Sequence, residues 1–132
     1  IVLTADHGML DIGERLDIAE CPELLADVDC VSGEERARHL YTGLPEAVAT
    51  RWREELGEAV LVMTKDEFIA TGALGEPTEH ARSVMGDVIV CADGSLSLFD
   101  SRGREPGRAP MIGVHGSLTD VEMTVPLLVE MV

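Results

Sequence analysis

Two short apolar runs, one at each end of the chain, adjoin a histidine that is followed by glycine. The first run, residues 1–5, leads into Asp6 and His7, and the second, residues 124–129, comes shortly after His115. Continuous aliphatic runs of this kind are typical of strands that are covered on both faces in a parallel sheet. We therefore expect both ends of the chain to belong to the interior of a larger parallel sheet.

The stretch between these ends, roughly residues 25–99, predicts a small mixed α/β unit. Its clearest helix begins at Pro45, a residue suited to the first helical turn, and ends at Gly57. Apolar side chains recur every four residues within this helix and form one buried face, at Val48, Trp52 and Leu56.

Turn and capping signals predict the remaining elements. They are a hairpin over 28–42 with Gly33 near its turn, a strand over 59–64, short helices over 64–72 and 77–83, and a hairpin over 87–99 that turns at Asp93-Gly94. Residues 8–29 and 100–110 are interrupted by Pro and Gly and predict a long connection and a surface loop. The Thr-x-x-Glu spacing of a capping box predicts that a short helix begins at Thr64 and another at Thr119.

With 132 residues, the chain is most simply one domain, 1–132, and can bury a core. It begins with isoleucine inside an expected strand, which predicts that it is a fragment of a longer catalytic domain. Within it, the segments 1–24 and 100–132 are the motif-bearing ends, and 25–99 is the central unit.

The composition excludes several classes of function. A net charge of −15, from 25 acidic and 10 basic residues, disfavours binding to a nucleic-acid backbone but is compatible with divalent cations. No apolar stretch approaches the ~18–20 residues of a membrane span. The three cysteines, Cys21, Cys30 and Cys91, have no zinc-ribbon spacing and are odd in number, so we expect buried free thiols, as in a reducing compartment.

Two of the four histidines stand out, because glycine directly follows both His7 and His115. In a plain strand Asp6 and His7 would point to opposite faces, whereas a turn at the glycine would let both approach one cation. Carboxylate oxygen and imidazole nitrogen are ordinary zinc ligands, although a polar turn that closes a strand explains the same residues. His39, in a strand, and His80, in a surface helix, are expected to be ordinary side chains.

The segments LTADHGM (residues 3–9) and GVHGSLTDVEMTVPLL (residues 113–128) together resemble the C-terminal portion of the alkaline phosphatase superfamily. They are most similar to its type I phosphodiesterase/nucleotide pyrophosphatase branch. The resemblance implies part of a three-layer α/β/α fold in which the Asp-His-Gly stretch ends a strand of the central sheet. It also implies a phosphodiester or nucleotide substrate.

The resemblance implies roles for three residues of this chain. Asp6 and His7 match the pair that binds one zinc of a two-zinc centre, and His115 matches a ligand of the other zinc. The nucleophile and the remaining ligands match nothing here, because in the family they lie N-terminal to this region. We therefore expect the isolated chain to be inactive and to hold zinc weakly or not at all. Tight binding would require a further local ligand, such as Asp11 or Asp120.

Two other functions remain open from the sequence. The same three residues would suit another hydrolase of the superfamily, such as a phosphomonoesterase, a phosphonate hydrolase or a sulfatase-like enzyme. A non-catalytic binding or oligomerisation module would also be compatible with them. Uncovered terminal strands favour a homodimer formed through residues 1–5 and 124–129, an exchange of these strands, or loosely ordered ends.

Overall fold

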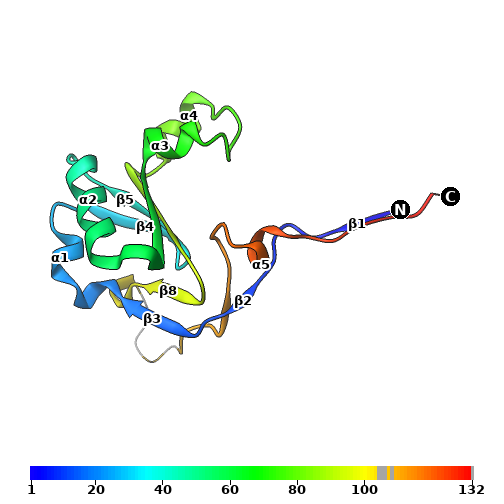
Figure 1. The fold of residues 1–132 in the computed structure, drawn as a ribbon, viewed down its shortest axis with the longest axis horizontal. Helices are drawn as coiled ribbons and strands as arrows, with labels where there is room; N and C mark the ends of the chain where they lie inside the picture. Colours follow the sequence, from blue (N-terminus) through cyan, green and yellow to red (C-terminus); the bar gives the residue numbers. More distant parts are fainter. Residues whose placement is uncertain (104–106, 108, 132) are drawn as a thin grey trace.

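The computed structural model of the chain describes residues 1–103, 107 and 109–131. A body of helices and strands carries a narrow two-stranded ribbon that extends away from it, and both termini lie at the ribbon's tip (Figure 1). The mixed α/β class predicted from the sequence is confirmed. The loop predicted over 100–110 falls partly outside the described residues.

A four-stranded antiparallel sheet forms the centre of the body. Its strands, in spatial order, are β4 (Cys30–Glu34), β5 (Ala37–Tyr41), β7 (Val88–Ala92) and β6 (Val60–Thr64). Every residue of β7 is buried, because the strand has a neighbour at each edge and side chains packed on both faces. The predicted hairpin over 28–42 and the strand over 59–64 are confirmed as β4–β5 and β6.

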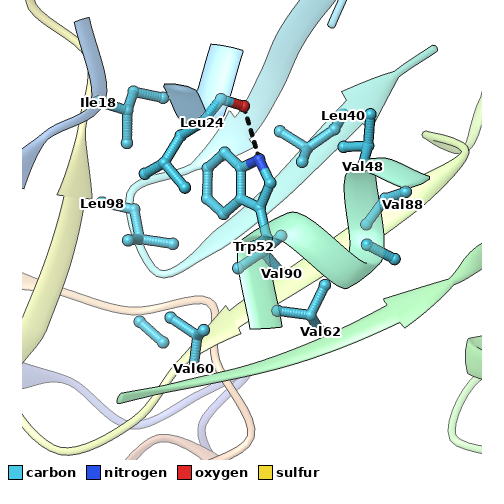
Figure 2. Close-up of a cluster of buried hydrophobic side chains, with 12 residues drawn as sticks. Ile18, Leu24, Leu40, Val48, Trp52, Val60, Val62, Val88, Val90 and Leu98 are labelled. Atoms are coloured by element: carbon cyan, nitrogen blue, oxygen red, sulfur yellow. Dashed lines mark hydrogen bonds between the residues drawn. The ribbon is translucent and has the colours of Figure 1, made fainter. Parts of the chain in front are cut away.

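Helix α2 (Pro45–Leu56) covers one face of this sheet, as its apolar spacing predicts. Trp52 of α2 is fully buried, and its indole N–H donates to the carbonyl of Leu24 at 2.7 Å (Figure 2). Leu24 belongs to α1 (Pro22–Leu25), which follows the short 3₁₀ turn η1 (Ile18–Glu20). The largest apolar cluster joins these helices to the sheet; its buried members are Ile18, Leu24, Leu40, Val48, Ala49, Trp52, Val60, Val62, Val88, Val90, Ala92 and Leu98.

A smaller apolar cluster covers the other face of the sheet. It contains Met63, Phe68, Met85, Ile89 and Cys91, and its helix is α3 (Lys65–Ala70). The predicted capping box is confirmed at the start of α3, where the Thr64 side chain accepts from the Glu67 backbone and the Glu67 side chain accepts from the Thr64 backbone. Helix α4 (Glu79–Val84) follows and corresponds to the second predicted short helix.

Three further strand pairs lie outside the four-stranded sheet. They are β1 (Val2–Thr4) with β10 (Leu127–Val129), β2 (Leu10–Asp11) with β9 (Gly113–Val114), and β3 (Glu14–Asp17) with β8 (Leu96–Phe99). The first two pairs are antiparallel and the third is parallel. The remaining elements are η2 (Gly57–Ala59), η3 (Ser101–Gly103) and α5 (Asp120–Met123).

The hairpin predicted over 87–99 is wrong in its pairing. Both strands form, but β7 lies between β5 and β6, so neither of its edges is free for β8. Strand β8 pairs instead with β3, which lies in the segment 8–29 that was predicted as a plain connection. A strand of four residues whose partner is far away in the sequence leaves no local signal to detect.

The terminal strands also differ from expectation. They pair with each other in an antiparallel ribbon rather than lying in a parallel sheet, and their side chains are exposed, with Val2 at 64% and Leu128 at 61%. The structure of one chain does not test the homodimer, which stays a prediction. All three cysteines are free, but only Cys91 is buried; Cys30 is exposed and Cys21 is half-buried, so the expectation of buried thiols is wrong for Cys30.

Among the described residues, no helix combines the length and the apolar character that a membrane crossing requires.

Candidate metal site at the base of the ribbon

His7 and His115, from opposite ends of the chain, lie face to face. Their ring centroids are 3.5 Å apart and their planes differ by 14°. His7 follows β1 and His115 directly follows β9, so the two strand pairs of the chain ends bring the rings together. Both side chains line a cavity of about 230 Å³, together with Asp6.

The backbone of the loop after β1 fixes the orientation of the His7 ring. Its Nδ1 lies 2.6 Å from the carbonyl oxygen of Gly8. A carbonyl can only accept, so Nδ1 carries the proton of the neutral ring, and Nε2 keeps a free lone pair. Nε2 lies 3.7 Å from Oδ2 of Asp6, whose side chain is 89% exposed. A carboxylate oxygen of Asp6 and a ring nitrogen of His7 therefore lie close together beside the cavity.

These donors fit part of a zinc site. Asp6, His7 and His115 supply one carboxylate and two imidazoles, which are ordinary zinc ligands. Across the part of the chain that the structure describes, no group of three or more His, Cys, Asp or Glu side chains is placed to hold a metal ion. Asp11 and Asp120, which a local cage would need, are both exposed. The described residues thus present an incomplete donor set, and a complete site would need ligands beyond them.

Glycine is required next to each of these two histidines. A Cβ atom on Gly8 would lie 1.8 Å from the carbonyl oxygen of Val121, because the loop after β1 presses directly against α5. Gly116 has a φ of +128° and would bring a Cβ to 3.1 Å from the Cβ of Glu34. The His-Gly pattern in the sequence therefore reflects close backbone approach at Gly8 and a turn at Gly116.

Replacing Gly8 with alanine should destabilise the chain by about 1–3 kcal/mol, because the new methyl group meets rigid backbone. The hydrogen bond from the Gly8 N–H to the carbonyl of Glu122, 2.7 Å long, should be lost as the loop shifts. Urea unfolding measures the cost, and Gly43→Ala is the matched control, since its Cβ would meet nothing within 4 Å. Equal stability of the two variants would contradict this close approach.

A buried ion pair that no sequence pattern predicted reaches the cavity of the two histidines, because Glu122 lines it. Glu122 of α5 and Arg36, in the turn between β4 and β5, have side-chain exposures of 2% and 0%. Two hydrogen bonds join them, from Nε to Oε1 at 3.1 Å and from Nη2 to Oε2 at 2.7 Å. Burial alone would raise the pKa of Glu122, but hydrogen bonds from Arg36, Thr119 and Ser117 outweigh it and lower the pKa to about 2.

The sequence predicts a different role for Glu122, as the glutamate of a capping box that begins at Thr119. The helix predicted at Thr119 forms as α5, but the capping box does not, because the Thr119 side chain accepts no bond from the backbone. The Thr119 hydroxyl instead donates to the Glu122 carboxylate. Glu122 lies two residues after Asp120, so the sequence around it carries no signal of a buried role. Arg36, in a hairpin turn, offered none either.

The other candidates have ordinary roles. Ser117 lines the same cavity but is 5% exposed, and its hydroxyl donates to the carbonyl of Ala92 at 2.6 Å, so the hydroxyl is already engaged and is not available as a nucleophile. His39 accepts the backbone N–H of Gly86 at 3.1 Å, and burial lowers its pKa. His80 is exposed on α4.

Comparison with solved structures gives matches over nearly the whole chain. Murine ectonucleotide pyrophosphatase/phosphodiesterase 5 superposes with a TM-score of 0.62 at 13% identity, and an inactive variant of it in complex with AMP superposes with 0.63 at 13%. The human protein of the same name superposes with 0.62 at 16%. The chain shares their fold. Each match covers 96% of this chain but 32% of the other, so the chain spans about a third of their length.

No family model matches the sequence, and no curated protein matches it. The shared architecture therefore rests on the arrangement of the elements. It agrees with the fold expected from the Asp-His-Gly and His-Gly segments, as part of an alkaline-phosphatase-like fold.

Proposed function

We propose that the chain is the C-terminal part of a zinc-dependent phosphodiesterase or nucleotide pyrophosphatase. In this proposal Asp6 and His7 bind one zinc ion and His115 binds a second. One observation carries it: two histidines from opposite ends of the chain stack at 3.5 Å, in a chain that shares the fold of a pyrophosphatase/phosphodiesterase. Two ligands this close suit neighbouring metal ions of the kind that act together on phosphoryl groups.

The chemistry of the donors supports this assignment. Two bound zinc ions would supply Lewis-acid activation of a hydroxyl nucleophile and of the phosphoryl oxygen. The chain's own part is to hold and orient ligands: Nδ1 of His7 faces the Gly8 carbonyl, which leaves Nε2, 3.7 Å from Oδ2 of Asp6, as the nitrogen that would bind metal. The net charge of −15 does not oppose a phosphate ester, because the local charge of a metal centre governs its binding.

The nucleophile and the other metal ligands come, in this proposal, from residues N-terminal to Ile1. The 132 residues alone should then be inactive. Ser117 is unsuited to replace the missing nucleophile, because its hydroxyl is buried and already donates to the carbonyl of Ala92.

The test is hydrolysis by the longer protein that we propose contains this chain. It should cleave an aryl phosphodiester or a nucleotide pyrophosphate in a chelator-sensitive manner, and His7→Ala or His115→Ala should lower the rate by orders of magnitude, because each removes a metal ligand. His80→Ala, on exposed α4, is the matched control and should leave the rate unchanged.

Two outcomes would redirect the proposal. Full activity in the His115→Ala variant would contradict the assignment of His115 as a metal ligand. Faster hydrolysis of a phosphomonoester, a phosphonate or a sulfate ester than of the phosphodiester would favour another hydrolase of the superfamily. A protein that binds no zinc and hydrolyses none of these would fit a non-catalytic module.

A further inference from the structure

Glu122 bonds to both loops that carry the facing histidines. Its backbone carbonyl accepts the N–H of Gly8, the residue directly after His7, at 2.7 Å. Its carboxylate accepts the N–H of Ser117, two residues after His115, at 3.0 Å through Oε1. One residue of α5 therefore fixes the loop on each side of the cavity.

Arg36 holds Glu122 in this position. The guanidinium donates a hydrogen bond to each carboxylate oxygen of Glu122, and its Nη1 also donates to the carbonyl of Leu96 at 2.6 Å. A two-point bond of this kind fixes the plane of the carboxylate as well as its distance. Because Leu96 begins β8, the ion pair ties α5 and both histidine loops to the body of the chain.

We infer that Glu122, held by Arg36, is a positioning residue that sets the face-to-face arrangement of His7 and His115. Its importance for catalysis rests on the proposed function, whereas its effect on the two rings is a property of this chain alone. In the active protein, the same bonds would keep ligands of two metal ions at a fixed separation. A metal centre works only when its ligands are held by such supporting contacts.

The experiment is nuclear magnetic resonance on the 132-residue chain without metal. The wild type should show a nuclear Overhauser effect between the ring protons of His7 and His115, and its absence would overturn the inference. Glu122→Gln keeps the side chain's size, but its amide NH₂ cannot accept from Nη2 of Arg36, so the two-point bond that fixes the plane of the side chain should be lost, and the ring contact with it. The control is Asp27→Asn, which changes an ion pair whose Asp27 side chain is 48% exposed. This variant should keep the contact between the His7 and His115 rings.

A second variant separates positioning from general stability. Apolar replacement of a buried ion pair is often neutral or stabilising, so Arg36→Met with Glu122→Met should remain folded. The indole N–H signal of Trp52, bonded to Leu24, reports the main core and should persist while the ring contact disappears, because methionine cannot accept from Ser117.

Each other result overturns the inference. An intact ring contact in both variants would show that Glu122 is not needed, and joint loss of the contact and the Trp52 signal in both would show a purely structural role. None of these measurements depends on metal or turnover. An inactive longer protein with the contact intact would therefore defeat the proposed function and leave the positioning role standing.

Discussion

Replacing Arg36 with methionine should lower the free energy of unfolding by about 3–5 kcal/mol, the usual cost of leaving one partner of a buried ion pair behind. Methionine removes both bonds to the Glu122 carboxylate and the bond to the Leu96 carbonyl, and fills much of the same space. Glu122, only 2% exposed, would then hold an uncompensated charge. A loss of this size is a large part of the ~5–15 kcal/mol that stabilises an ordinary domain.

The pH dependence of this loss has a definite sign. In the wild type the pKa of Glu122 is lowered from 4.5 to about 2, so its ionised form contributes stability above pH 4.5 that is lost as the pH falls toward 2. A shift of this size corresponds to about 3 kcal/mol. Without Arg36 the pKa of Glu122 in the folded chain should be higher than in the wild type. The stability difference between the two proteins should therefore shrink as the pH falls.

Urea unfolding followed by circular dichroism, repeated between neutral pH and about pH 3, measures both effects. The matched control is Arg82→Met, whose ion pair with Asp66 is 3.9 Å long and joins side chains that are 48% and 93% exposed. Exposed pairs contribute little, so that variant should lie within about 1 kcal/mol of the wild type. A pH-independent difference for Arg36→Met would contradict the role given to the Glu122 charge.

Local signals predicted those parts of the fold that are stabilised by residues close in the sequence. Helix α2 begins at Pro45 and ends at Gly57, and α3 begins with its capping box at Thr64, as expected. The hairpin of β4 and β5 also forms within one short segment. In each case the turn or cap and the buried face lie within about a dozen residues, so the pattern is complete in one stretch of sequence.

Pairings between distant segments could not be predicted in the same way. An Asp-Gly turn after a buried strand favours a hairpin, but β7 has β5 and β6 as neighbours, so β8 pairs with β3. The terminal apolar runs were correctly expected to be strands. Their antiparallel pairing depends on how the two ends meet, which the composition of each run does not encode.

The residues of the candidate site also divide into those that a local sequence pattern marks and those that depend on distant segments. Asp6, His7 and His115 were identifiable because a glycine follows each histidine, and the structure places the two rings together; their role as zinc ligands stays a proposal. Arg36 was not identifiable, since an arginine in a hairpin turn is normally exposed. It is buried here because α5, from the other end of the chain, packs its Glu122 against that turn.

The second large effect is expected at Trp52, the chain's single tryptophan. Trp52→Ala should lower the free energy of unfolding by about 3–5 kcal/mol, because the indole is fully buried between α1, α2 and the sheet and its removal leaves a cavity. Trp52→Phe keeps most of the apolar contact but leaves the Leu24 carbonyl without its N–H donor, so a smaller loss of about 1–3 kcal/mol is expected.

Urea unfolding followed by circular dichroism serves for all Trp52 variants, since fluorescence disappears with the indole. Leu61→Ala is the matched control, because Leu61 lies on β6 of the same sheet but is 48% exposed. It should cost less than Trp52→Ala, and the reverse order would mean that the core does not centre on α2. Trp52→Phe should also keep the His7–His115 ring contact, because no bond to Glu122 or Arg36 involves the indole. If Trp52→Phe weakens the core but keeps the ring contact, while Glu122→Gln keeps the Trp52 signal but loses the ring contact, then the contacts of Glu122, and not the packing around Trp52, set the arrangement of the two histidines.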